Sequence, residues 1–303
     1  MLFFKPKTFS QFGGLWIDHK DADSVLARRM KRGKLSCELA DRIHQFMRDG
    51  RVVFEHAVSK ELTAKIKAEL LDYWMHPPEG AIVENWTDGN QQFVRPDIML
   101  RDGATKLLDF HAFSATARKA IAAPKVIEFL TAIFEETPKA FQTLTFWKGS
   151  EQAIHKDTAY VQVNGAPMHL AATWLALENV KPGAGALDYY LGSHRTPDFL
   201  FGGKHKWMEH APEDHDRFLS SMHEDAAAYG LKKESFLAKE GDVLIWHADL
   251  AHGGCPITDK TLTRQSLVTH FTGAKYNPPY VKRLQRVPVE ENGCLFVAQH
   301  KQI

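Results

Sequence analysis

Residues 152–158 read Gln-Ala-Ile-His-Lys-Asp-Thr, which places a histidine and an aspartate two positions apart. In a β-strand, side chains two residues apart point to the same side, so we expect His155 and Asp157 to face one interior together. An imidazole and a carboxylate suit a first-row metal ion, and a second histidine would complete a facial set of three ligands. The stretch therefore predicts a metal site built on a strand.

A second histidine is available in residues 241–254, which read Gly-Asp-Val-Leu-Ile-Trp-His-Ala-Asp-Leu-Ala-His-Gly-Gly. His247 and His252 compete for the role, because the first follows an apolar run and the second stands beside two small residues. Further on, Arg264 and Ser266 open another apolar run, where an arginine and a hydroxyl on one face could hold a carboxylate. Two histidines and one carboxylate are the ligands of non-haem Fe(II) oxygenases, which leave three coordination positions open.

Short β-branched and aromatic runs surround these motifs and alternate with turn signals such as Lys-Pro-Gly-Ala-Gly and Gly-Gly. The strands that they predict cover residues 141–147, 168–177, 186–191, 242–246 and 265–272. Several short strands at irregular spacing favour a jelly roll of two sheets.

The first third of the chain is different, with a tail at 1–35 followed by helical patterns. Ser36 and Ser59 can cap helices whose apolar residues repeat at helical spacing. Residues 202–231 interrupt the later strands, and we treat them as an insert or lid with a helix in it. The predicted fold class is α+β and mainly β: one double-stranded β-helix (cupin-like jelly roll) domain, 1–303, with an N-terminal helical layer packed on the major sheet.

Composition restricts the possible functions. The 38 Lys and Arg residues balance 37 Asp and Glu residues, and a net charge of +1 lacks the broad positive field of a nucleic-acid-binding protein. Three cysteines without paired spacing favour neither disulfides nor a zinc site, and we expect Cys255 to be inert. No apolar run predicts a secretion signal or a membrane span. We therefore expect a cytoplasmic protein that acts on a small molecule, without a nucleic-acid or membrane partner.

The ordered set of motifs resembles the phytanoyl-CoA dioxygenase family of Fe(II)- and 2-oxoglutarate-dependent oxygenases. The resemblance runs from about residue 50 to residue 272 and is strongest at 141–195 and 241–272. It includes the His-x-Asp pair, a Gly-Ser-His-Arg run, the second histidine after a Gly-Asp strand, and the Arg-x-Ser pair. At Leu191-Gly192 the sequence departs from the more usual Pro-Gly, which affects a turn and not the metal ligands.

The resemblance implies that His155, Asp157 and His252 bind Fe(II), with 2-oxoglutarate and O2 completing the coordination. It implies an oxidation in which 2-oxoglutarate is converted to succinate and CO2. Because related halogenases have a small residue in place of the aspartate, a carboxylate at 157 favours hydroxylation, or a variant such as desaturation, over halogenation.

The resemblance also implies a cosubstrate pocket. Arg264 and Ser266 would hold the 5-carboxylate of 2-oxoglutarate, while Gln142 and Trp174 fall where the family lines that pocket. We expect Tyr160 and the insert to form walls or a lid over the substrate.

Several histidines keep another interpretation. His169 and His270 lie in apolar strands, which is typical of core histidines with satisfied hydrogen bonds. We expect His194 to be structural and His247 to be a packed or hydrogen-bonded residue. The four histidines of the insert have acidic neighbours, which is more typical of a solvated helix than of a second metal site.

The substrate and the activity also have alternatives. Arg95, Arg101 and Lys148 either bind an anionic substrate group or are solvated surface charges, and the loop at 80–103 matches no family motif. The main alternative function is a jelly-roll protein that keeps the metal site and binds a ligand without turnover. A third is an oxygenase that acts on a protein or a nucleic acid.

Overall fold

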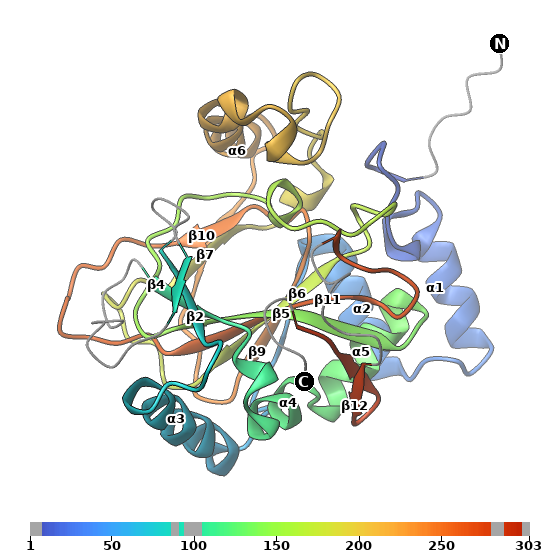
Figure 1. Ribbon diagram of the computed structural model, residues 1–303. Helices are drawn as coiled ribbons and strands as arrows, with labels where there is room; N and C mark the ends of the chain where they lie inside the picture. The colour runs from blue at the N-terminus through green and yellow to red at the C-terminus, as the bar shows by residue number, and fades with distance from the viewer. Residues whose placement is uncertain (1–7, 86–90, 94–104, 280–287, 299–303) are drawn as a thin grey trace.

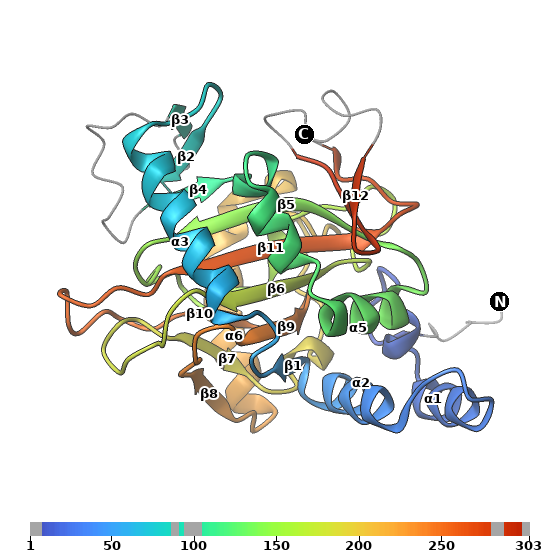
Figure 2. The same ribbon diagram turned by 90° about the horizontal axis from the view of Figure 1, so that it is seen from below.

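The computed structural model of this 303-residue chain describes residues 8–85, 91–93, 105–279 and 288–298. Within them, one large sheet lies across from a sheet of three strands (Figure 1). Helices cover the outer face of the large sheet, as Figure 2 shows from below. This arrangement confirms the predicted α+β class, with two facing sheets and an N-terminal helical layer.

The large sheet has ten strands in the described residues: β1 (Arg51–Phe54), β2 (Ile82–Asn85), β3 (Gln91–Phe93), β4 (Thr105–Leu108), β5 (Pro138–Phe146), β6 (Ala171–Ala176), β9 (Val243–His247), β11 (Ser266–Gly273), β12 (Val289–Glu291) and β13 (Cys294–Phe296). The small sheet consists of β7 (Leu187–Tyr190), β8 (Lys233–Phe236) and β10 (His252–Gly254). The five strands predicted from the sequence are all present, with their ends shifted by at most three residues.

The order of the large sheet is β1-β9-β6-β11-β5-β4-β2-β3, and β13 joins β5 by a parallel pairing. Its central strand, β11, is buried along its whole length. Leu267 and Phe271 pack into the core beneath the helices, whereas Val268 packs with Trp174 and Trp246 on the other side. Because side chains alternate along a strand, the even-numbered residues of β11 face the space between the two sheets.

The helices are α1 (Ala22–Lys31), α2 (Cys37–Asp49), α3 (Lys60–Met75), α4 (Ala115–Ile121), α5 (Pro124–Phe134) and α6 (His215–Ala228). The side chains of Ser36 and Ser59 accept hydrogen bonds from backbone N–H groups of the first turns of α2 and α3, as predicted. Gly50 ends α2 in the left-handed conformation, at a φ of 76°. No helix in the described residues is both long and apolar enough to cross a membrane.

Two segments differ in character from the rest of the fold. The described part of the N-terminal segment, which we expected to be a tail, contains α1, and its Leu15, Ile17 and Leu26 are buried in the core. Residues 202–231 contain α6, which lies on the side of the molecule opposite α3 and α4 (Figure 1). The apolar residues that repeat at helical spacing on α6 are buried: Phe218, Met222 and Ala226.

Candidate metal centre

A short antiparallel bridge joins His155 to His252, the first residue of β10. The backbone N–H of His155 donates to the carbonyl of His252 at 2.8 Å, and the reverse hydrogen bond is 2.9 Å long. Residues that are directly paired in this way have their side chains on the same side. The two imidazole rings accordingly lie with their centroids 4.6 Å apart.

The glycines after His252 allow β10 to approach the segment that carries His155. A Cβ atom on Gly253 would lie 2.6 Å from the carbonyl oxygen of Gln152, and one on Gly254 would lie 2.6 Å from Oγ of Ser150. Both distances are too short for any side chain, so a larger residue would push the two segments apart. The small residues are therefore a geometric condition of the bridge.

Asp157 does not lie in a strand, which corrects our expectation for this motif. It begins a short 3₁₀ helix, η3 (Asp157–Ala159), directly after the bridge. The backbone N–H groups of Tyr160 and Val161 donate to its carbonyl oxygen at 2.9 and 2.8 Å. A tight turn, and not the two-residue period of a strand, therefore directs the carboxylate toward His155.

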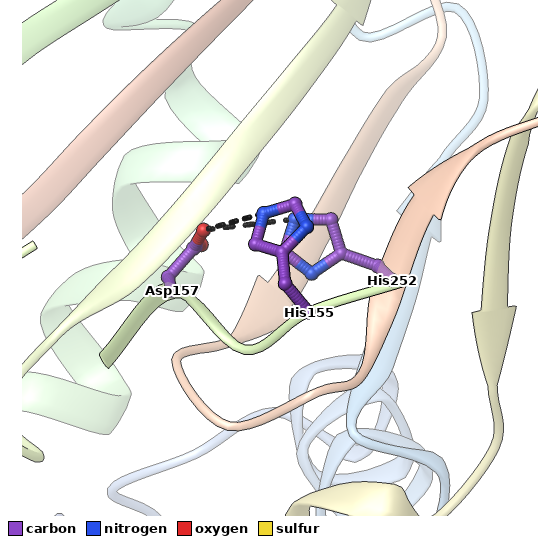
Figure 3. Close-up of side chains that lie close together, drawn as sticks. All are labelled: His155, Asp157 and His252. Carbon is purple, nitrogen blue, oxygen red and sulfur yellow. Dashed lines mark ion pairs between the residues drawn. The ribbon is translucent and has the colours of Figure 1, made fainter. Parts of the chain in front are cut away.

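The three side chains meet at one buried point (Figure 3). Asp157 Oδ1 lies 3.7 Å from His155 Nε2 and 3.6 Å from His252 Nε2. One potential ligand atom from each residue lies within 4.8 Å of the other two, so the group could hold a metal ion. No other such group of His, Cys, Asp or Glu gathers in the described part of the chain.

Backbone carbonyl groups fix the tautomer of both imidazoles. His155 Nδ1 lies 2.7 Å from the oxygen of Ala153, and His252 Nδ1 lies 2.9 Å from that of Leu250. Each Nδ1 therefore donates its proton to a carbonyl, which leaves a lone pair on each Nε2. In the neutral rings, these lone pairs and the carboxylate oxygen Oδ1 face one another. A cation at this point would turn their repulsion into attraction.

The electrostatics of the site favour the protonation states that a metal requires. Burial, helped by the neighbouring His252, lowers the pKa of His155 to about 4, so its imidazole is neutral at pH 7. Burial alone would raise the pKa of Asp157, but His252, His270 and His155 together hold it well below its ordinary value. The site thus presents a carboxylate and an unprotonated imidazole at neutral pH.

Residues of the large sheet contact the second carboxylate oxygen of Asp157, Oδ2. Trp246 Nε1 donates to Oδ2 at 2.7 Å. His270 Nε2 lies 3.6 Å from the same oxygen, which is too long for a hydrogen bond, and neither ring nitrogen has a hydrogen-bond partner in the described residues. The expectation that His270 is a satisfied core histidine is therefore wrong. The two-residue period from Arg264 and Ser266 could have placed it on the site face.

A cavity of about 710 Å³ opens beside the triad, within the size range of small-molecule sites. Gln142, Trp174 and Arg264 line it, as does His270. Ser266 is fully buried on β11, two residues beyond Arg264 on the same face. The structure thus brings the residues named for the cosubstrate to the same region as the triad.

Arg264 is a buried cation with no carboxylate partner in the described residues. It is 2% exposed, Nη1 donates to the oxygen of Gly185 at 3.2 Å, and Nε has no partner. Its guanidinium lies over the rings of Phe146 and Trp174, at 5.8 and 5.5 Å. Burial lowers the pKa of Arg264 to about 10, so it stays positive at pH 7. Ser266 Oγ and Trp174 Nε1 are also buried without partners, and this set of donors suits a carboxylate.

The competing histidine, His247, takes part in a different contact. Its Nε2 lies 3.1 Å from Asp18 Oδ1, and its Nδ1 accepts a hydrogen bond from the backbone of Asp249. His194 packs beside it, with ring centroids 5.1 Å apart. Both are buried packing residues, and it is His252 that joins the His-x-Asp pair.

The insert forms part of the cavity wall, through Trp207, Met208 and His215. Tyr160 Oη lies 2.7 Å from His215 Nε2, and the ring of Tyr160 packs edge-on against His155 at 5.4 Å. One side chain therefore links the insert to a residue of the triad.

The cations considered for a substrate have different surroundings. Lys148 donates to a backbone carbonyl at 2.9 Å and does not line the cavity. Arg95 and Arg101 lie outside the described residues. Lys106, which the sequence analysis missed, does line the cavity and is paired with Glu84 at 2.6 Å. Lys106 lies within β4, with no motif around it, so the sequence held no signal for it.

A double-stranded β-helix that carries a buried His-Asp-His triad defines the class of this protein. The sequence model of the phytanoyl-CoA dioxygenase (PhyH) family matches residues 46–265, which is most of the chain. The chain therefore belongs to this family of Fe(II)- and 2-oxoglutarate-dependent oxygenases. Among curated proteins, none matches the sequence.

Solved structures confirm the fold. The epimerase SnoN in complex with Fe3+, alpha ketoglutarate and nogalamycin RO is 16% identical with a TM-score of 0.57, covering 80% of this chain and 86% of that one. EctD from S. alaskensis with 2-oxoglutarate and 5-hydroxyectoine is 18% identical with a TM-score of 0.56, covering 80% and 77%. The carbocyclase SnoK from nogalamycin biosynthesis is 14% identical with a TM-score of 0.55, covering 88% and 97%. At such identities the likeness shows a shared fold alone.

Proposed function

We propose that this protein is a dioxygenase that uses Fe(II) and 2-oxoglutarate to hydroxylate a small molecule, with release of succinate and CO2. The observation that carries the proposal is the pairing, in one cavity, of a converging His-Asp-His group with a buried arginine that has no anionic partner in the described residues. A reaction of a metal-bound dicarboxylate needs ligands for the metal and a cation for the carboxylate that is not bound to the metal. Structures of similar fold hold iron and 2-oxoglutarate, which supports the same assignment here.

The donor set fits Fe(II). His155 and His252 would contribute their Nε2 atoms and Asp157 its Oδ1, because these atoms face one another while each Nδ1 contacts a backbone carbonyl. When bound, the iron supplies the site at which O2 and 2-oxoglutarate react to form an oxidant for a C–H group. The carbonyls of residues 153 and 250 hold the rings so that Nε2 faces the metal position.

The orphaned donors fit the far end of 2-oxoglutarate. Arg264 would bind the 5-carboxylate through charge-assisted hydrogen bonds, with Ser266 as a second donor. Trp174 packs beneath the guanidinium, and Gln142 lines the cavity. A buried guanidinium without an anion is costly, and the cosubstrate would remove that cost.

The small-molecule assignment rests on the size of the cavity. Its volume, about 710 Å³, accommodates a cosubstrate and a compact substrate. Tyr160 and the insert residue His215 would exclude water from the side above the triad, which a radical reaction requires.

Anaerobic addition of Fe(II) and then 2-oxoglutarate tests the proposal. We expect a weak visible charge-transfer band from the ternary complex, and release of succinate once air is admitted. A screen of small molecules for faster succinate release would then identify the substrate. Formation of the band without succinate from any candidate would favour the ligand-binding alternative, and absence of the band would contradict the cofactor assignment.

A further inference from the structure

Two nitrogen atoms from different strands approach the same oxygen of Asp157. Trp246 on β9 donates to Oδ2 at 2.7 Å, and His270 on β11 has its Nε2 3.6 Å from it. The other oxygen, Oδ1, faces the two imidazoles of the triad. The carboxylate therefore has one oxygen directed to the metal position and the other directed to the sheet.

The sheet register explains how both residues reach the carboxylate. Strand β6 lies between β9 and β11, and its Ala172 is paired with Trp246 on one side and with His270 on the other. All three side chains share one face of the sheet, so a methyl group separates two large rings. The small residue leaves room between the rings for the carboxylate of Asp157.

The ring of His270 is held in place by packing and not by a hydrogen bond. A β-bulge in β5 adds Phe141 opposite the bond between His270 and Phe271, and the ring of Phe141 stacks on the imidazole at 6.2 Å and 25°. His270 is 3% exposed, and neither nitrogen makes a hydrogen bond in the described residues. Asp157 Oδ2 lies 3.6 Å from His270 Nε2. An immobilised N–H donor beside a buried carboxylate is positioned to donate a hydrogen bond to it.

We propose that His270 and Trp246 are positioning residues that together hold Asp157 Oδ2, so that only Oδ1 is presented to the metal. The proposal rests on the proposed function, since it assumes that Asp157 is a metal ligand. Its consequence is that the carboxylate binds through one oxygen and leaves the remaining coordination positions for the cosubstrate and O2.

Binding of Co(II) to the metal-free protein, measured by calorimetry without 2-oxoglutarate, tests the role of His270. His270→Phe keeps a ring of similar shape but no donor, and we expect it to weaken Co(II) binding about 10- to 100-fold. His270→Gln places an amide N–H where Nε2 was and should recover most of the affinity. His270→Asn places its donor nearer to Nδ1 and should recover little. His169→Phe, at a ring-stacked histidine outside the cavity, is the matched control and should bind Co(II) as the wild type does.

Trp246→Phe removes the other donor and should weaken Co(II) binding by a similar factor. Wild-type affinity in His270→Phe would overturn the proposal, as would equal weakness in the Phe and Gln variants, which would show that shape matters and not the donor. Normal Co(II) binding with weaker 2-oxoglutarate binding would also overturn it and assign His270 to the cosubstrate. If the wild-type protein itself binds no Co(II), the proposed function fails, which is a separate result.

Discussion

At the scale of single residues, we expect the carboxylate of Asp157 to have the largest effect on metal-dependent activity. Its Oδ1 faces the Nε2 atoms of both His155 and His252. Asp157→Gly removes the carboxylate, and we expect iron-dependent succinate formation to fall by roughly a thousandfold or more. Mutation of residues that only contact a metal ligand already lowers metal affinity or activity by about 10- to 100-fold, and loss of a ligand should have a larger effect. Succinate assays measure this, with Asp216→Asn on the exposed side of α6 as the control. Full activity in Asp157→Gly would contradict the ligand assignment.

Arg264 gives a second test at this scale. Arg264→Ala removes the buried cation that lacks an anion, and we expect 2-oxoglutarate to bind more weakly by about 2 to 3 kcal/mol, roughly 30- to 150-fold. The measurement is a titration of the iron-loaded protein with 2-oxoglutarate in the absence of O2. Lys148→Ala removes a cation outside the cavity and should change nothing. An unchanged affinity in Arg264→Ala would mean that another residue holds the carboxylate.

The sequence predicted which residue types gather at the site, and the structure corrected how they are oriented. His-x-Asp, the histidine before two glycines, and Arg-x-Ser were each visible in the sequence because spacing and neighbours carry information. The role of His270 was not visible in the sequence. The sequence pattern of an apolar strand is the same whether its histidine contacts a hydrogen-bond partner or faces a cavity. Only the pairing of β11 with β5 and β6 shows what lies opposite it.

At the scale of elements, the approach of β10 to the segment before His155 determines whether the two histidines meet. Gly253→Ala would place a methyl group 2.6 Å from the oxygen of Gln152. We expect the free energy of unfolding to fall by about 1 to 3 kcal/mol and the affinity for Co(II) to fall as well. Denaturation with urea and calorimetry measure the two effects.

Gly273→Ala is the control for that prediction. A Cβ there would lie 2.8 Å from Cε1 of His169, which is a collision with a side chain and not with the backbone, at the far end of β11. We expect a loss of stability without a loss of metal affinity. If Gly253→Ala kept the wild-type metal affinity, the bridge between His155 and His252 would not determine the positions of the metal ligands.

Elements were predictable where local chemistry determines them. Ser36 and Ser59 cap their helices as predicted, because a capping hydroxyl acts within one turn. The backbone structure of residues 152–158 was not predictable in this way, since His155 pairs with a residue distant in sequence and Asp157 then begins a turn. Long-range pairing overrode the local pattern there. The bulge at Phe141 was equally invisible, because its cause is the register of the partner strand.

At the scale of the whole molecule, buried histidines make stability depend on pH. His111 links distant parts of the chain, with Nδ1 2.9 Å from Thr143 Oγ1 and Nε2 2.8 Å from the oxygen of Val297. Burial lowers its pKa to about 4 in the folded protein. Between pH 6.5 and 4 the unfolded chain therefore binds more protons at this residue, so its contribution is lost as the pH falls through that window.

The effect of His111 is measurable by comparison with a variant. From pH 7 to pH 5, we expect this residue alone to account for a loss of about 2 kcal/mol in the free energy of unfolding. His111→Gln should remove that share of the pH dependence, although it is less stable at pH 7. Urea unfolding at both pH values measures it, with the exposed His44→Gln as the control. An identical slope in His111→Gln and the wild type would show that His111 does not titrate in this way.

The metal site requires three residues, from two segments distant in sequence, that the two-sheet fold brings together. Anaerobic titration with Fe(II) of the wild type, His252→Ala and His223→Ala tests it most directly, since His223 lies on α6 and contacts Tyr190. We predict one Fe(II) per chain in the wild type and in His223→Ala, and binding weakened about 100-fold or more in His252→Ala. Wild-type binding of Fe(II) by His252→Ala would contradict the account.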